Sequence, residues 1–155
     1  MGEPAKEIDD FIKQVSEHKG GIATLHVFDY NSSHTSDQTL QQTVERLKTS
    51  FPQISVGSGT NAFFTELNRN RINHPGLDHI VYSMNPQVHA FDNSSLIETL
   101  YAQPDTVKTA KSFSVEKGIH ISPITLKMRW NPNATSADED AGDNALDPRQ
   151  VSLFG

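Results

Sequence analysis

Short apolar runs alternate with helical patterns along most of this 155-residue chain. The helical patterns space their apolar residues three and four apart, as Ile8, Phe11, Ile12 and Val15 do. Strands that alternate with helices pair in parallel through right-handed crossovers. The chain is therefore predicted to be an α/β protein with a parallel sheet, whose strands are expected at residues 22–28, 54–56, 79–83 and 119–121.

Local signals mark the ends of the predicted helices. Gly20 and Gly21 are expected to end the first helix, and Pro52 the second. Ser95 and Glu98 match a capping box, and one of residues 93–95 is expected to cap the next helix. Pro104 is expected to start a further helix that runs to about residue 113.

The composition excludes several classes of function. The net charge is -6, with no basic stripe, which disfavours nucleic acid and anionic membranes as partners. Without cysteine, disulfides and thiolate metal sites are excluded. No apolar run approaches the roughly 20 residues of a membrane span, and the first residues lack a signal-peptide pattern. A cytoplasmic protein is expected.

Polar side chains follow each predicted strand. The second strand is expected to end in a loop at residues 59–61, before a short helical turn at residues 63–67. In a parallel α/β sheet such loops open on one edge, so residues distant in sequence should converge there. The residues predicted to bind a substrate at this edge are Asn61, Asn68, Arg69, Asn85, Gln87, His89, Arg129 and Asn131.

Glu66 is the candidate for a general acid, base or nucleophile. Partial burial among Phe63, Phe64 and Leu67 would suit a carboxyl group to proton transfer. The alternative is a helix-surface glutamate paired with Arg69 or Asn70, which would stabilise the helix by about 0.2–0.5 kcal/mol. Spacing alone does not separate the two.

The segment at residues 85–92 is a second dense polar patch. The side chains of Gln87 and His89 can hydrogen-bond the hydroxyl groups of a sugar. Asp92 is a candidate partner that would fix the imidazole tautomer of His89. The alternative for Asp92 and Asn93 is turn chemistry, with one of them capping the next helix.

No metal and no cofactor are predicted. His26, Asp29, Glu66 and His89 are metal-ligand types, but no two of them have a ligand spacing such as that of two histidines one helical turn apart. The segment at residues 57–59 resembles part of a phosphate loop, yet the complete nucleotide-binding patterns are absent.

Four stretches of the sequence resemble the D-apionate lactonase family, in the same order along the chain. The resemblance covers about residues 22–155. It implies a TIM-barrel domain, related in style to glycoside hydrolases and flanked by β-rich domains, and hydrolysis of a D-apionolactone-type sugar lactone to the aldonate. The stretches are residues 59–69, 85–92, 122–127 and 129–134.

The chain is shorter than a barrel of about 250 residues. The resemblance therefore implies a fragment, roughly half of a (β/α)8 barrel. Residues 1–130 would form four βα units, and residues 131–155 a polar loop and the start of a further barrel element. Such a fragment, inactive alone, is expected to expose an apolar face and to self-associate through its sheet edges.

Two other functions remain open from the residues. One is a glycoside-hydrolase-like enzyme that uses the same edge of the barrel. The other is a non-catalytic carbohydrate-binding domain, complete in four strands. All three interpretations share a small-molecule sugar or sugar lactone as the ligand.

Overall fold

The computed structural model describes residues 4–17, 21–30, 32–87, 89–127 and 146–152. Helices and strands alternate along the chain, with two consecutive helices before the last strand. The strands are β1 (Thr24–Val27), β2 (Ser55–Phe63), β3 (His79–Met84) and β4 (Gly118–Ile124). The helices are α1 (Pro4–Ser16), α2 (Asp37–Ser50), α3 (Phe64–Arg69), α4 (Asn93–Leu100), α5 (Gln103–Phe113) and the 3-10 helix η1 (Pro148–Val151).

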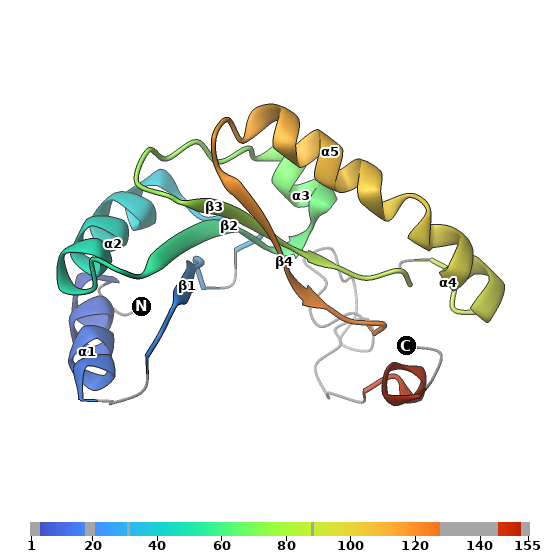
Figure 1. Ribbon diagram of the computed structural model, residues 1–155, viewed down its shortest axis with the longest axis horizontal. Coiled ribbons are helices and arrows are strands. Elements are labelled where there is room, and N and C mark those ends of the chain that lie inside the picture. The colour runs from blue at the N-terminus through green and yellow to red at the C-terminus, as the bar shows by residue number, and fades with distance from the viewer. Residues whose placement is uncertain (1–3, 18–20, 31, 88, 128–145, 153–155) are drawn as a thin grey trace.

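The four strands form one parallel sheet in the order β1-β2-β3-β4. The sheet is arched, and α2, α3 and α5 cover its convex side (Figure 1). Each strand thus lies beside the next one along the chain, as successive βα units of a barrel do. The prediction of an α/β fold with parallel βα units is confirmed, and the arch is a partial TIM barrel.

The hydrophobic core lies between the sheet and the helices. Alternate strand residues point to opposite sides of a sheet. Val56, Ile80 and Tyr82 point to the convex side, where they pack in one cluster with Leu40 and Leu47 of α2. This apolar face explains why the strands were recognisable as apolar runs.

The concave side of the sheet carries the other set of strand residues. His26 of β1, His79 of β3 and His120 of β4 belong to this set. Gly57 of β2 pairs with both His26 and His79, and Gly118 of β4 pairs with His79 on its other side. The same set includes Val81, which pairs with His120 and is buried. The exposed apolar face expected of half a barrel stays a prediction.

β2 is longer than its apolar run indicated. The strand continues to Phe63 and includes residues 59–61, so the prediction of a loop there is wrong. An added Cβ at Gly59 would lie 2.0 Å from the carbonyl oxygen of Val81, and one at Gly57 would lie 2.1 Å from Nε2 of His79. Glycine at these positions makes room for the Val81 backbone and the His79 side chain of β3. In the sequence alone, the same glycines are also typical of a loop.

Two aspartates near strand ends anchor the starts of helices. The Asp29 carboxylate accepts hydrogen bonds from the Ser36 backbone N–H and from the Thr39 hydroxyl, next to the N-terminus of α2. Asp92 is the N-cap of α4 and accepts from the backbone N–H of Ser95 at 3.0 Å. The predicted cap at residues 93–95 is wrong, and the alternative that Asp92 caps this helix is confirmed.

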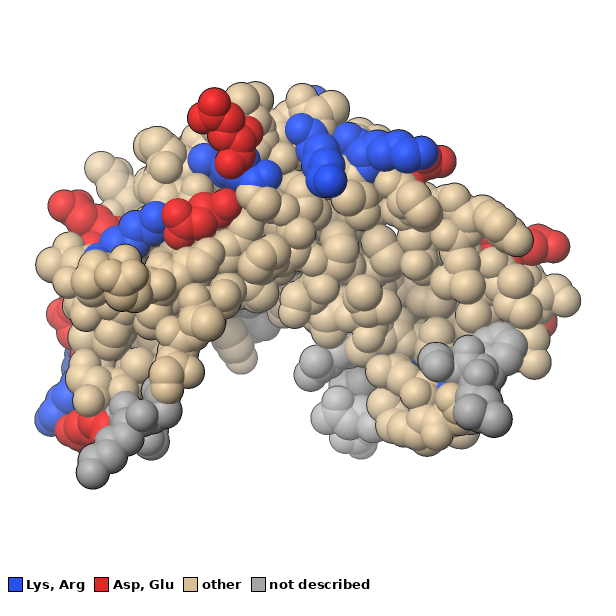
Figure 2. All heavy atoms as spheres, in the orientation of Figure 1, with Lys and Arg blue, Asp and Glu red and all other residues tan. Residues whose placement is uncertain are grey.

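Charged side chains gather over the helical side of the molecule. In Figure 2 the Lys, Arg, Asp and Glu residues in view lie mainly over the convex side, and the rim of the hollow beneath the sheet shows few of them. Among the described residues, no helix has the length and apolar character needed to cross a membrane.

Candidate functional site

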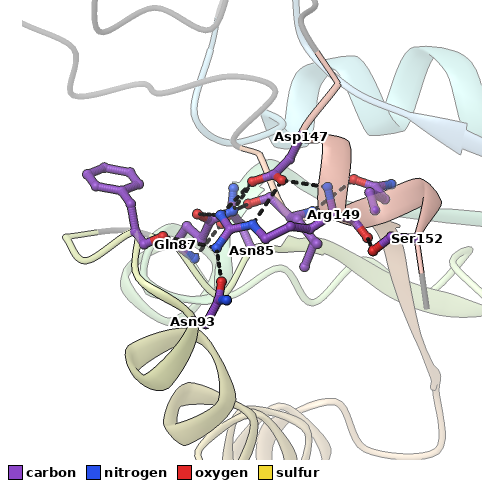
Figure 3. Close-up of polar contacts among 9 residues, drawn as sticks. Asn85, Gln87, Asn93, Asp147, Arg149 and Ser152 are labelled. Carbon is purple, nitrogen blue, oxygen red and sulfur yellow. Dashed lines mark hydrogen bonds and ion pairs between the residues drawn. The ribbon is translucent and has the colours of Figure 1, made fainter. Parts of the chain in front are cut away.

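A hydrogen-bonded network lies just beyond the carboxyl end of β3. Arg149 of η1 donates through Nη2 to Oε1 of Gln87 and to Oδ2 of Asp147, the latter at 2.7 Å. Its Nη1 donates to Oδ1 of Asn93 at 2.9 Å. Figure 3 shows the guanidinium reaching between these three side chains. The network joins the segment after β3, the start of α4 and η1.

The Gln87 side chain is occupied on both sides of its amide group. Its Nε2 donates to the carbonyl oxygen of Leu126, which follows β4, and to Oδ2 of Asp147 at 2.8 Å. Hydrogen bonds from Arg149 and then Gln87 hold the pKa of the Asp147 carboxyl well below its usual range. The geometry suits Gln87 to fixing the ends of β3 and β4, since its amide has protein partners.

Asn85 differs from Gln87 in having an amide nitrogen without a partner. It directly follows β3, is 8% exposed, and accepts the Gln87 backbone N–H through Oδ1 at 2.6 Å. Among the described residues, its buried Nδ2 has no hydrogen-bond partner. A buried amide N–H without an acceptor costs about 1–3 kcal/mol, so an oxygen of a bound ligand would stabilise this position.

Glu66 lies in α3, directly after β2. Its side chain is mostly shielded from solvent, with 6% of the residue exposed. Arg69 lies one turn further along α3, and its Nη1 is 3.8 Å from Oε1 of Glu66. Because Phe63 of β2 pairs with Ser83 of β3, the segments that carry Glu66 and Asn85 leave the sheet at adjacent positions.

The other predicted substrate-binding residues are exposed or lie outside the described residues. Asn61, in β2, and His89 are exposed. Asn68 is exposed on α3, where its Oδ1 accepts hydrogen bonds from Arg71. The exposed guanidinium of Arg69 is directed to Glu66. The predicted binding residues Arg129 and Asn131 lie outside the described residues.

Two aspartates have structural contacts in place of the roles predicted for them. Asp92 was a candidate partner for His89, but its carboxylate accepts from the backbone N–H and the hydroxyl of Ser95. Asp29 was a possible metal ligand, but it holds the residues that begin α2. Asp92 is the N-cap of α4, and Asp29 holds Ser36, the N-cap of α2.

Sequence reasoning missed Asp147 and Arg149, which lie about 60 residues after Gln87. Residues 131–147 have no periodicity, so they were interpreted as a polar loop. One local signal was present: Asp147 followed by Pro148 is the pattern of an N-cap before a proline at the first helical position. That signal predicts η1 but not the contact of Arg149 with Gln87.

Within the described part of the chain, one group of side chains has the arrangement of metal ligands. His26, His79 and His120 each offer a ring nitrogen, and these atoms lie within 4.8 Å of one another. Burial, followed by the charges of His120 and His26, lowers the pKa of His79 to about 4. Burial and the charge of His120 also lower the pKa of His26. Low pKa values favour neutral imidazoles, the form that binds metals.

Comparison with known proteins agrees with the arched parallel sheet of a partial TIM barrel. A D-apionate lactonase of Brucella anthropi is 30% identical over 120 residues, which cover 74% of this chain and 20% of that protein. The chain therefore spans about a fifth of the length of this relative. No solved structure matches the chain. The D-apionate lactonase TIM barrel domain matches residues 1–155, and the chain belongs to this family.

Proposed function

We propose that this chain forms part of the substrate-binding edge of a sugar lactonase, which hydrolyses a D-apionolactone-type lactone to the aldonate. The observation that carries the proposal is the buried Nδ2 of Asn85, which lies at the carboxyl end of β3 without a partner among the described residues. In TIM-barrel enzymes this end of the strands carries the active site. Family membership supplies the substrate class.

Asn85 and Gln87 have different roles in this proposal. The Asn85 amide donates a hydrogen bond to an oxygen of the bound lactone. Gln87 is a positioning residue, because Asp147, Arg149 and the carbonyl of Leu126 already occupy its amide. Asn61, Asn68, Arg69, His89, Arg129 and Asn131 remain predicted substrate contacts.

Glu66 is proposed as the general base. Its carboxylate removes a proton from a water molecule while the water oxygen bonds to the lactone carbonyl carbon. The resulting tetrahedral oxyanion is stabilised by hydrogen-bond donors such as the Asn85 amide. When the ring C–O bond breaks, the proton returns from Glu66 to the departing ring oxygen, which leaves an open-chain hydroxy acid.

Replacing Glu66 by glutamine is expected to lower kcat for lactone hydrolysis by at least about 100-fold, because an amide accepts no proton at this step. The protein to use is the product of the complete open reading frame that encodes this chain. A pH-stat would follow acid release from D-apionolactone and other aldonolactones. Glu98→Gln, an exposed position on α4, is the matched control and should retain full activity.

Three other results would change this proposal. Unchanged turnover in Glu66→Gln would remove Glu66 from the mechanism. Release of reducing sugar from glycosides without lactone hydrolysis would favour the glycoside-hydrolase-like alternative. Binding of about one sugar per chain without any turnover, measured by calorimetry, would favour a carbohydrate-binding domain.

We also propose that the 155-residue chain self-associates through the edges of its sheet. Among the described strands, β1 and β4 each pair on one side, which leaves a row of backbone groups open on the other. Ile124, the last residue of the outer strand β4, is exposed.

The mass from light scattering is expected to rise with protein concentration. Ile124→Lys should reduce this rise, because a charged side chain at an edge strand opposes pairing. Val115→Lys adds the same charge at an exposed position outside the sheet and should have little effect. A constant monomer mass over the whole concentration range would contradict self-association.

A further inference from the structure

Three histidines from three strands meet on the concave side of the sheet. Gly57 of β2 pairs in register with both His26 and His79. The Nε2 atom of His79 occupies the space of a Cβ at Gly57, so this ring lies over β2. His120 lies beside it on β4, with the two ring centroids 3.7 Å apart. The glycine therefore permits the rings to gather.

Two ring nitrogens of this cluster have no hydrogen-bond partner among the described residues. Nε2 of His26 and Nε2 of His79 are both buried, and neither atom makes a hydrogen bond within the described residues. His79 itself is 1% exposed. Its other nitrogen, Nδ1, is 3.0 Å from the Ser55 hydroxyl. A hydrogen bond from Nδ1–H to Ser55 leaves a lone pair on Nε2, the tautomer that second-shell contacts impose on metal-binding histidines.

Ring stacking alone does not satisfy the two buried Nε2 atoms. The stacked pair of His79 and His120 and the edge contacts of His26 bury imidazole faces, yet they give no partner to either Nε2 atom. Leaving two buried polar atoms unsatisfied costs roughly 1–3 kcal/mol each. An ion between the three rings would satisfy both.

We propose that His26, His79 and His120 bind one divalent transition metal ion, with Zn²⁺ as the natural occupant. Three neutral imidazoles suit Zn²⁺, with a water molecule in the fourth position of a tetrahedron. Bonds of about 2.0–2.1 Å require nitrogens about 3.4 Å apart, so the rings must close from their present limit of 4.8 Å. His120 is exposed and supplies this movement by side-chain rotation.

The site is remote from the proposed substrate-binding edge. His79 begins β3 and Asn85 follows its end, six residues further on, which is about 20 Å along an extended strand. The ion would therefore join β1, β3 and β4 near their amino ends and stabilise the arch. Its presence is independent of the lactonase proposal.

The test is Zn²⁺ binding by the purified chain, freed of any polyhistidine tag and treated with a chelator. Titration with ZnCl2 is expected to give about one ion per chain and a higher Tm, because an ion that binds only the folded state stabilises it. Addition of CoCl2 instead should give the visible absorption bands of four-coordinate Co²⁺. Neither readout depends on enzymatic activity.

Two variants separate the histidine site from non-specific binding. His120→Gln removes an exposed ligand and is expected to weaken Zn²⁺ binding at least about 100-fold, since loss of an outer-shell partner alone costs 10–100-fold. Gly57→Ala keeps all three histidines but displaces the His79 ring, and should weaken binding similarly. His34→Gln, at an exposed histidine outside the cluster, is the control and should bind Zn²⁺ as the wild type does.

Circular dichroism would first establish that each variant is folded. The proposal is overturned if the wild-type chain takes up no Zn²⁺, or if His120→Gln binds it as tightly as His34→Gln does.

Discussion

Replacing Gly59 by alanine is expected to lower the free energy of unfolding by about 3 kcal/mol or more, the upper range of overpacking costs. The new Cβ would lie 2.0 Å from the carbonyl oxygen of Val81 and 3.0 Å from its backbone nitrogen. Because the obstacle is the backbone of β3, no side-chain rotation relieves the contact. The strands must move apart, which weakens the pairing of β2 with β3.

Urea unfolding followed by far-UV circular dichroism would measure this loss. Gly21→Ala is the matched control, since no atom lies within 4 Å of a Cβ added there, and its effect should stay within about 0.5 kcal/mol. Gly57→Ala should fall between the two, because its obstacle is the His79 side chain. Equal stability of the Gly59 and Gly21 variants would contradict the close approach of β2 and β3.

Replacing Tyr82 by alanine is expected to cost about 3–5 kcal/mol, as large aromatic truncations in cores do. Tyr82 is 0% exposed and lies at the centre of the convex face. Its ring meets Phe64 of α3 edge-on at 5.6 Å, and its hydroxyl is 2.8 Å from that of Thr106 in α5. The substitution would remove contacts to two helices at once.

Tyr82→Phe isolates the contribution of the hydroxyl group and should cost about 1 kcal/mol. Tyr101→Ala is the control for loss of an aromatic ring outside the core, because Tyr101 is 82% exposed. The same urea titrations would measure all three variants. A cost for Tyr82→Ala no larger than that for Tyr101→Ala would place Tyr82 outside the core.

The two ends of the sheet carry different chemistry. At the carboxyl end, amide and guanidinium groups converge from three segments after β3. Near the amino end, imidazoles line the concave side. This division follows the general pattern of barrels, in which the carboxyl end serves catalysis and the amino end serves stability.

Periodicity predicted most of the fold because each element buries one face. Ile8 to Val15 lie within α1, and the apolar runs at residues 79–83 and 119–121 lie within β3 and β4. The same logic failed at residues 59–61, where glycines required by strand packing were interpreted as a loop. A glycine that admits a neighbouring strand and a glycine in a turn are identical in sequence.

The candidate site was predicted in part. Asn85 and Gln87 were identified because polar groups after a strand collect at one edge of a parallel sheet, and both lie there. The sequence indicated His26 as a metal-ligand type but not His79 and His120, because no two of these histidines have helical spacing. Ligands on three separate strands have no fixed spacing along the chain.

The sequence by itself determined the α/β class, the parallel βα order and the family, since these depend on local periodicity and on short contiguous motifs. Only the tertiary structure decided that Arg149 binds Gln87, and that His26, His79 and His120 share one surface. The physical reason is that strand register and sheet curvature set these contacts. Both arise from packing between segments that lie 41 to 94 residues apart in the sequence.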